Sequence, residues 1–461
     1  MKFLNSYQVM VKVLILAYDF PPYVSVGGLR PYGWFKYFHQ FEIYPIVITR
    51  QWSNQYGNYL DYIAPGESNS DIIEETSQGT IIRTPYFPNL ANRLMLKYGE
   101  SKYRLARKSI SAFYEFAQFI VPIGPKSQLY KSADSFLSSH KVDMIIATGD
   151  PFVLFNYAKK LSHQYHIPWI ADYRDPWSQK TDIQNNFLLK KWHMFFEKKI
   201  VSHAYCITTV SEFLKTSILS IVKHHNVQII KNGYDPEAME ASKEINQRND
   251  VLGVALAGSI YDWHPLKKVL TVFSELIKID TNVKFEINFY GINIYSKHIQ
   301  GNINELISSE FPNLNEFIKV HSKIPNDRLL KELAKQNVML LFNDYSILGT
   351  KIFDYIGLHR NILFCFENDE ESERLRSKYF TLQESKFSNQ KLQIDAIHET
   401  QSGYVIRDGQ HLLKKLNELN LEFKEHGFIK SNAILTDQYS RKHQVEQLAS
   451  LIKNISLQKK Q

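Results

Sequence analysis

The chain has 461 residues, of which 44% are hydrophobic and 13% aromatic, so it is long enough to bury two separate cores. Its formal net charge of +8 is modest, and no nucleic-acid-binding motif accompanies the basic residues, which argues against a nucleic-acid partner. No run reaches the roughly 20 apolar residues of a membrane-spanning helix. The two cysteines provide no disulfide framework. We therefore expect a protein of the cytoplasm.

The first half of the chain alternates short apolar runs with amphipathic stretches. Strands are expected at 11–18, 44–50, 80–84, 142–148, 168–172, 204–210 and 227–231, and helices at 152–166 and 211–222. This alternation predicts an α/β domain with a parallel, doubly wound sheet. Such a sheet binds ligands at the carboxyl ends of its strands.

A second alternating unit follows a polar stretch at 236–250, which is expected to be a linker. Its strands are expected at 251–259, 284–290, 318–324, 338–343 and 362–366, with helices at 264–279, 327–335 and 351–358. A last helix is expected near 440–455. Two similar α/β domains facing one cleft are the simplest architecture for this pattern.

The loop after the first apolar run contains Asp19 and two prolines, and then reaches Gly27 and Gly28. The prolines end the strand, and a helical pattern begins just beyond the glycines. Paired glycines allow a ligand to approach the backbone closely, and the first N–H groups of the helix are free to bind an anion. The pattern predicts that Gly27 and Gly28 line a ligand site.

The stretch from Arg93 to Lys131 is strongly basic and contains interleaved apolar residues. A segment of this kind binds the surface of an anionic membrane. A solvated basic helix packed on its own domain has the same composition. Both interpretations remain open from the sequence.

Charged residues follow two neighbouring strands of the first half. Asp150 lies in the segment Thr148-Gly149-Asp150-Pro151-Phe152, and Asp172, Arg174 and Asp175 lie in WIADYRDPW. At the carboxyl end of a strand these groups would face the ligand crevice. A buried Asp–Arg pair that fixes the turn is the structural alternative.

Two further motifs lie near the end of the first half. TVSE at 209–212 is followed after a spacer by NGYD at 232–235. Ser211 is a good N-cap and Asn232-Gly233 a good turn, so local structure accounts for most of this pattern.

The second half offers two glycine turns. Gly258 and Ser259 end its first strand, where a small residue makes room for a diphosphate or a sugar. Gly349 and Thr350 precede Lys351 at the start of a short helix, whose free N–H groups could hold phosphates.

Together these motifs resemble the GT-B glycosyltransferases, and in particular the bacterial family 4 enzymes. The resemblance rests on YDFPP with GGLR, on WIADYRDPW, on TVSE with NGYD, and on GTKIFDY at 349–355. It implies two Rossmann-like domains: an acceptor-side domain at 1–240 and a nucleotide-sugar-binding domain at 241–439. It also implies that the helix at 440–461 packs back on the first domain.

The resemblance implies roles for individual residues. In the first domain, Asp172 or Asp175 would orient the acceptor hydroxyl, Arg174 would hold a phosphate or the partner carboxylate, and Gly27, Gly28 and Asp150 would lie on the acceptor side. In the second, Gly258, Ser259, Gly349, Thr350 and Lys351 would bind the donor.

The family places an arginine and a lysine beyond the first of these turns. The arginine is missing here, and the candidates for the cation are His264, Lys267 and Lys268. Lys267 would be the remaining phosphate ligand, and an exposed helical lysine is the alternative. Asp354 would accept the ribose hydroxyls. The family's first glutamate is replaced by Ser346.

We therefore expect a glycosyltransferase of cell-surface polysaccharide biosynthesis. It would move a sugar from a nucleotide-sugar to a glycan or lipid-linked acceptor, with retention of configuration and without metal or cofactor. Localisation would be cytoplasmic, with peripheral contact to an anionic membrane. The alternatives are a nucleotide-sugar epimerase of similar fold and a catalytically silent scaffold of polysaccharide assembly.

Overall fold

The computed structural model describes residues 10–23, 25–52, 59–179, 186–281, 283–295, 302–345, 348–378 and 391–458. The chain divides into two compact units. Unit 1 consists of Met1–Lys231 with Gln444–Gln461, and unit 2 consists of Asn232–His443. Each unit is described by itself.

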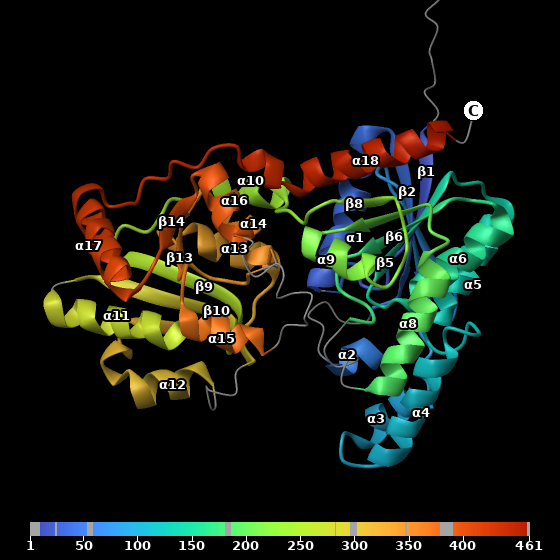
Figure 1. Ribbon diagram of the computed structural model, residues 1–461, viewed down its shortest axis with the longest axis horizontal. Helices are drawn as coiled ribbons and strands as arrows, with labels where there is room; N and C mark the ends of the chain where they lie inside the picture. The colour runs from blue at the N-terminus through green and yellow to red at the C-terminus, as the bar shows by residue number, and fades with distance from the viewer. Residues whose placement is uncertain are drawn as a thin grey trace, which may run out of the picture. The chain divides into compact units, whose positions relative to one another are not determined.

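The described part of unit 1 contains an eight-stranded sheet in the order β3-β4-β2-β1-β5-β6-β7-β8 (Figure 1). Only the pair of β3 and β4 is antiparallel. The strands are β1 (Val11–Leu16), β2 (Ile43–Arg50), β3 (Ile72–Glu75), β4 (Thr80–Thr84), β5 (Met144–Gly149), β6 (Trp169–Tyr173), β7 (Cys206–Thr209) and β8 (Val227–Ile229).

Helices cover both faces of this sheet. They are α1 (Val26–Tyr37), α2 (Tyr59–Ile63), α3 (Leu90–Tyr98), α4 (Arg104–Ala117), α5 (Ser127–Ser139), α6 (Val153–Tyr165), α8 (Phe187–Val201), α9 (Glu212–Leu219) and, from Gln444 on, α18 (Arg441–Gln458). Side chains of β1 alternate between two cores, with Leu14 in one and Ile15 in the other. The second core includes Leu448 and Ile452 of α18, drawn in red in Figure 1. A strand buried on both faces reads as a continuous apolar run, as the sequence does at 11–18.

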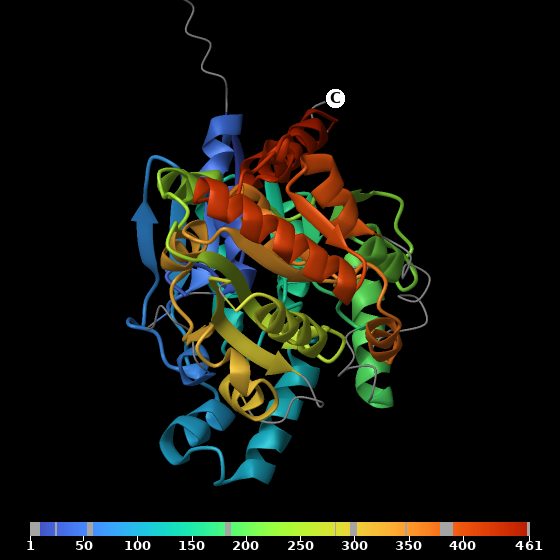
Figure 2. The same cartoon turned by 90° about the vertical axis from the view of Figure 1, so that its left-hand side faces the viewer.

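The described part of unit 2 contains a six-stranded, fully parallel sheet in the order β11-β10-β9-β12-β13-β14. The strands are β9 (Leu252–Tyr261), β10 (Phe285–Tyr295), β11 (Ile318–His321), β12 (Val338–Phe342), β13 (Asn361–Cys365) and β14 (Gly403–Ile406). The helices are α10 (Pro236–Lys243), α11 (Leu266–Ile279), α12 (Ile303–Glu310), α13 (Asn326–Ala334), α14 (Thr350–Gly357), α15 (Glu370–Ser377), α16 (Leu392–Thr400) and α17 (Gly409–His426). Figure 2 shows α11 and α17 lying next to one another across this unit, and the two helices are in contact.

The sequence predicts most of the strands and several of the helices to within a few residues. Both sheets are doubly wound as expected; the second is parallel, and the first is parallel except for the pair of β3 and β4. The sequence missed β3, which contains two glutamates, and β14, which begins with a glycine, because both residue types are depleted in strands. The expectation of a linker at 236–250 was wrong for its first part. Residues Pro236–Lys243 form helix α10 because Asp235 caps it by accepting a hydrogen bond from the Glu237 N–H, and Pro236 fits the first helical position.

The basic stretch forms α3, α4 and the beginning of α5. Helix α4 has no buried residue, and Leu105 and Phe113 are 81% and 62% exposed. The guanidinium of Arg107 donates hydrogen bonds to the carbonyl oxygens of Lys102 and Glu100, so it fixes the turn between α3 and α4. The exposed Arg104, Leu105, Lys108 and Phe113 give part of α4 a basic and apolar surface.

Candidate functional site

The strand order reverses at one point in each sheet. In unit 1 this point lies between β1 and β5, and in unit 2 between β9 and β12. Connections leave in opposite directions there, so the carboxyl ends of these strands are where open α/β sheets bind ligands. The motifs of the sequence lie at these two edges.

At the edge of unit 1, Asp172 is fully buried and paired with Arg30. The Arg30 guanidinium donates through Nη2 to Oδ1 of Asp172 at 2.8 Å and through Nε to both oxygens. Thr208 donates to Oδ1 at 2.7 Å and Thr148 to Oδ2 at 2.9 Å. Arg30 also donates to the carbonyl oxygens of Ile230 and Lys231. This carboxylate is therefore engaged from inside the protein and joins α1, β5, β6, β7 and the segment after β8.

Arg174 lies against the first glycine of the α1 loop. A Cβ placed on Gly27 would lie 1.8 Å from its guanidinium nitrogen, so a larger residue here would displace the Arg174 side chain. Arg174 donates to the carbonyl oxygens of Gly149 and Asp150, both at 2.9 Å. It forms a 3.7 Å ion pair with Asp175, whose side chain is 54% exposed. Four of the residues expected on the acceptor side, Gly27, Asp150, Arg174 and Asp175, therefore meet here.

Asp19 is a further carboxylate at this edge, in the loop after β1. The Ser25 hydroxyl donates to it at 2.7 Å and at the same time caps α1 by accepting from the Gly27 N–H. Burial raises the pKa of Asp19, although the bond from Ser25 and the charge of Arg174 oppose that shift. The backbone of Asp19 and Phe20 lies 3.4 Å from a Cβ placed on Gly28.

Helix α8 holds the loop that carries Arg174 and Asp175. The buried Trp177 donates through its indole N–H to Nδ1 of His193 at 2.7 Å. The buried Glu197 accepts hydrogen bonds from the Ser178 N–H and the Tyr173 hydroxyl, both at 3.1 Å. Side chains of α8 thus fix the position of this loop.

At the edge of unit 2, Gly258, Ser259 and Lys351 come together. Strands β9 and β12 pair only at Val254 and Ala255, and β9 then continues to Tyr261. Gly258 has a φ of +87°, which favours glycine, and a Cβ there would lie 2.7 Å from Cε of Lys351. The Lys351 ammonium donates to the Ser259 carbonyl oxygen at 2.9 Å. Burial lowers the pKa of Lys351, and the charge of Asp344 opposes that shift.

A buried histidine supports the same edge. His264 Nε2 and Asp344 Oδ1 are 3.1 Å apart, and Nδ1 of His264 accepts a hydrogen bond from the Tyr261 N–H at 3.3 Å. Burial lowers the pKa of His264, which matches a neutral ring that donates to Asp344 through Nε2. A Cβ on Gly349 would lie 3.0 Å from Asp344, so the start of α14 adjoins this pair.

Helix α14 begins at Thr350, with Gly349 as an N-cap that forms no side-chain capping bond. Lys351 lies in its first turn and Asp354 one turn further on. Burial raises the pKa of Asp354 to about 6, the charge of Arg441 opposes this shift, and that of Asp235 adds to it. Ser346 lies outside the described residues. The expected contact of Asp354 with a ribose stays a prediction.

Lys267 takes a different position from Lys351. It lies in the first turn of α11, its side chain is 41% exposed, and its ammonium forms a 2.6 Å ion pair with Glu310 of α12. The structure does not bring it into the group formed by Gly258, Ser259 and Lys351. This is the environment of the exposed helical lysine that the sequence left open as an alternative.

The residues of the NGYD motif have structural partners. Asp235 caps α10 and forms a 3.7 Å ion pair with Arg441. Arg441 also donates to the Gly233 carbonyl oxygen at 3.1 Å. Ser211 of TVSE caps α9 by accepting a hydrogen bond from the Leu214 N–H, as the sequence predicted.

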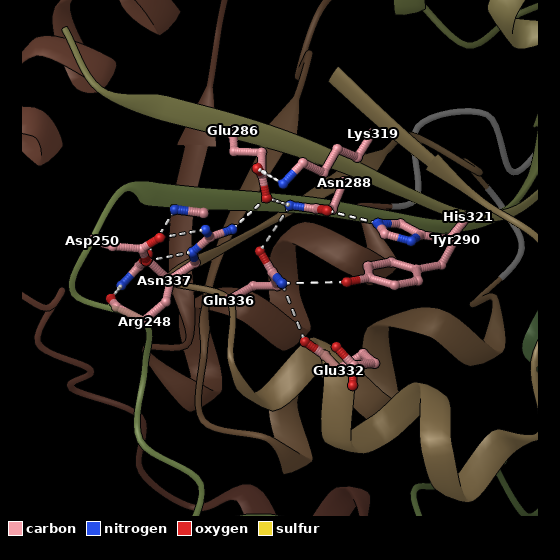
Figure 3. A network of polar contacts seen from close by, with 11 residues as sticks. Arg248, Asp250, Glu286, Asn288, Tyr290, Lys319, His321, Glu332, Gln336 and Asn337 are labelled. Carbon is pink, nitrogen blue, oxygen red and sulfur yellow. Dashed lines mark hydrogen bonds and ion pairs between the residues drawn. The ribbon is translucent and has the colours of Figure 1, made fainter. Parts of the chain in front are cut away.

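A larger charged cluster lies near the amino ends of β9, β10 and β12, at the opposite edge of the sheet (Figure 3). Its labelled members are Arg248, Asp250, Glu286, Asn288, Tyr290, Lys319, His321, Glu332, Gln336 and Asn337. Burial disfavours the charge of Glu286, but hydrogen bonds from Lys319, Asn288 and Arg248 lower its pKa to about 2. These groups satisfy one another, so the cluster ties strands together.

The described residues contain no group of three or more His, Cys, Asp or Glu side chains that could hold a metal ion. Within the same residues, no helix combines the length and the apolar character needed to cross a membrane.

Comparison with solved structures identifies the fold. The chain is similar to sucrose-phosphate synthase from Thermosynechococcus elongatus, at 12% identity and a TM-score of 0.51 over 97% of both chains. It is similar to a trehalose-6-phosphate structure from E. coli bound with UDP-2-fluoro glucose, at 10% identity and a TM-score of 0.53 over 96% of this chain and 99% of that one. An α,α-trehalose-phosphate synthase (UDP-forming) from Burkholderia vietnamiensis has a TM-score of 0.52 at 11% identity, over 96% of each chain. The chain therefore has the GT-B fold, with two Rossmann-like domains.

Comparisons of the sequence itself gave no relative. No protein-family description matches the chain, and no curated protein matches it. The assignment to family 4 therefore rests on the motifs alone.

Sequence reasoning gave no role to Arg30, Asp19 and Asp344. Arg30 ends the GGLR motif, and its partner Asp172 is 142 residues away, so only the fold reveals the pair. Asp19 could have been found as the first carboxylate after a buried strand.

Sequence reasoning named His264 and Lys268 beside Lys267 as candidates for the cation of the diphosphate. The structure pairs His264 with Asp344, and Lys268 with Asp369 and Glu371.

The Arg30–Asp172 pair yields a test of stability. Arg30→Met leaves Asp172 buried without its cation, so the free energy of unfolding should fall by about 3–5 kcal/mol. Arg83→Met is the control, because Arg83 pairs with the half-exposed Glu74 on the same sheet and should cost less than about 1 kcal/mol. Urea unfolding followed by circular dichroism measures both. Equal losses would contradict a central role for the pair.

The raised pKa of Asp354 predicts a pH effect. Its ordinary value is 3.8, and in the folded protein it is about 6, so the folded state binds the proton more tightly. Wild-type stability should therefore fall as pH rises from about 4 to about 6. Asp354→Asn should be more stable than wild type by about 1–3 kcal/mol at pH 7.5, and the difference should fade toward pH 4.

Asp250→Asn gives a control of opposite sign. Hydrogen bonds from Arg248 lower the pKa of Asp250 to about 2, so its contribution is present at neutral pH and is lost only in acid. This variant should be less stable than wild type at pH 7.5. Thermal unfolding across the pH range compares the two, and a pH-independent gain in Asp354→Asn would contradict the shift.

Proposed function

We propose that the protein is a glycosyltransferase that moves a sugar from a nucleotide-sugar to a glycan or lipid-linked acceptor in cell-surface polysaccharide biosynthesis. The observation that carries the proposal is the group of Gly258, Ser259 and Lys351 at the ligand-binding edge of unit 2. It combines a partly buried cation, a close backbone approach and the start of a helix in one place. These are the elements that bind a diphosphate.

The donor half of the reaction belongs to unit 2 in this proposal. Charge develops on the leaving diphosphate when the sugar–phosphate bond breaks. The Lys351 ammonium and the first N–H groups of α14, after Gly349 and Thr350, would stabilise that charge. This arrangement gives the protein its own cationic group for the leaving diphosphate, so we propose that turnover needs no added metal ion. One neighbour of the same fold is bound with UDP-2-fluoro glucose, which favours a UDP-sugar as the first donor to test.

The acceptor half belongs to unit 1. Asp172 is engaged by Arg30, so we assign it a positioning role rather than contact with the acceptor. Asp175 is exposed and Asp19 carries a raised pKa, and both lie near Arg174. We propose that one of these two carboxylates orients the acceptor hydroxyl and that Arg174 holds an anionic group nearby.

The experiment for this function is turnover by the purified full chain. A panel of UDP-, GDP- and ADP-sugars is first compared by thermal shift, since a ligand that binds only the folded state raises apparent stability. The stabilising donor should then release its nucleoside diphosphate when a glycan or lipid-linked acceptor is added, with or without EDTA. Proton NMR of the product should show the donor's anomeric configuration retained. An interconverted donor sugar would indicate an epimerase, and binding without turnover would indicate a scaffold.

The donor assignment is tested with two lysines. Lys351→Met should lower kcat by about 100-fold or more, because it removes a cation that faces the developing charge. Lys267→Met is the comparison, because Lys267 is exposed and paired with Glu310, and we expect a change of less than about threefold. Steady-state kinetics on the stabilising donor measures both variants. A larger loss of kcat in Lys267→Met than in Lys351→Met would contradict the assignment and make Lys267 the ligand of the diphosphate.

The surface of α3 and α4 supports a further part of the proposal, contact with an anionic membrane that supplies a lipid-linked acceptor. Each basic residue near such a surface contributes about 1 kcal/mol. Arg104→Gln with Lys108→Gln should therefore weaken binding to vesicles containing anionic lipid by about tenfold or more, and wild-type binding should fall as salt rises. Lys243→Gln with Lys414→Gln in unit 2 is the matched control. Unchanged vesicle binding by the Arg104→Gln, Lys108→Gln variant would contradict membrane contact through this surface.

A further inference from the structure

A cavity of about 840 Å³ lies in unit 1, away from the ligand-binding edge of its sheet. Its walls come from one side of α6, the end of α8 and the residues after it, the first residue of β6, one residue of α5 and the segment after α4. Figure 1 shows α5, α6 and α8 on the same side of unit 1. The volume falls in the range of sites for small molecules. The residues assigned to the acceptor or the donor do not line it.

The inner wall is apolar. Phe119, Trp169, Phe196 and Ile200 line the cavity, and each is at most 7% exposed. Ile120 continues this wall outward and is 57% exposed. An alkyl or prenyl chain placed along these side chains would remove its apolar surface from water. This burial is the main source of affinity for such a ligand.

The rim carries positive charge. Lys159, Lys160, Lys199, His163 and His203 line the cavity, and its described lining contains no Asp or Glu. Two of these lysines are held in place by backbone carbonyl oxygens. Lys159 donates to the carbonyl oxygen of Lys199 at 2.8 Å, and Lys160 donates to the carbonyl oxygen of Ile120 at 3.3 Å.

The basic groups are crowded as well as partly buried. Burial lowers the pKa of Lys159, and the nearby charge of Lys199 lowers it further. Burial also lowers the pKa of Lys160. The pKa of His203 is lowered by burial and, in addition, by the charge of Lys159. An anion among them would relieve this repulsion and shift these pKa values upward.

We propose that this cavity binds an amphiphile with a phosphate headgroup. The phosphate would pair with Lys159, Lys160 and Lys199, and the chain would pack on Phe119, Phe196 and Ile200. A free phosphate would not use the apolar wall, and an uncharged chain would not use the three lysines. The site is independent of nucleotide binding in unit 2.

The test is isothermal titration calorimetry of the full chain with dodecyl phosphate below its critical micelle concentration. We expect one molecule to bind, at least tenfold more tightly than inorganic phosphate or dodecyl maltoside. Equal affinity for inorganic phosphate would show a site for free anions, and binding only above the micelle concentration would show detergent adsorption. Either result overturns the proposal.

Variants place the site on the molecule. Lys159→Gln with Lys199→Gln should weaken the binding of dodecyl phosphate at least tenfold. Lys190→Gln with Lys191→Gln should not weaken it, because these two lysines lie on α8, as Lys199 does, but outside the cavity. Equal effects of the two pairs would overturn the assignment. The melting temperature of each variant and its thermal shift with UDP are measured on the same samples, so a folding defect or a failure of nucleotide binding is seen separately from loss of this site.

Discussion

The buried ion pair of Arg30 and Asp172 organises the candidate site of unit 1. Removing two charges from water costs several kcal/mol for each ion, and only a complete set of partners offsets that cost. Here Asp172 accepts from Arg30, Thr148 and Thr208, while Arg30 also donates to two backbone carbonyls. One interaction thus fixes the start of α1 relative to the ends of three neighbouring strands. Arg174, two residues beyond Asp172, is thereby placed over Gly27, and the exposed Asp175 is left facing solvent.

Unit 2 reaches a similar geometry with different chemistry. Its edge contains a neutral His264 bonded to Asp344, and a lysine held by a backbone carbonyl over a glycine of positive φ. The strongly ionic network of this unit lies at the amino ends of the strands, where each charge finds a partner (Figure 3). The charges at that end stabilise the sheet, whereas the Lys351 ammonium at the other end donates to the Ser259 carbonyl oxygen and is suited to a ligand anion.

The two sheets could be predicted from the sequence because strands buried on both faces read as apolar runs. The start of α9 could be predicted because Ser211 is a good helix cap. Strands β3 and β14 were missed because the glutamates of β3 and the glycine of β14 are depleted in strands, so neither segment reads as an apolar run. Helix α10 was missed because Met239 is its only large buried side chain, so its sequence lacks helical periodicity. The partner of Asp172 could not be predicted, since pairing across 142 residues depends on strand order. The sequence placed Asp172, Arg174 and Asp175 together but could not tell which of them faces inward.

The two candidate lysines of the donor site show the same limit. Lys267 and Lys351 both lie in the first turn of a helix that follows a strand, so their sequence contexts are equivalent. What separates them is the direction of the side chain. Lys267 points to Glu310 of a neighbouring helix, whereas Lys351 crosses the end of β9 and meets the Ser259 carbonyl oxygen. An ammonium already paired with a carboxylate has its charge neutralised, and a second anion gains little from it. An ammonium anchored by a carbonyl oxygen has no bonded carboxylate to neutralise it, and Lys351 lies in a partly buried place. We therefore propose Lys351 as the ligand of the diphosphate, and the missing family arginine does not by itself leave this edge without a cation.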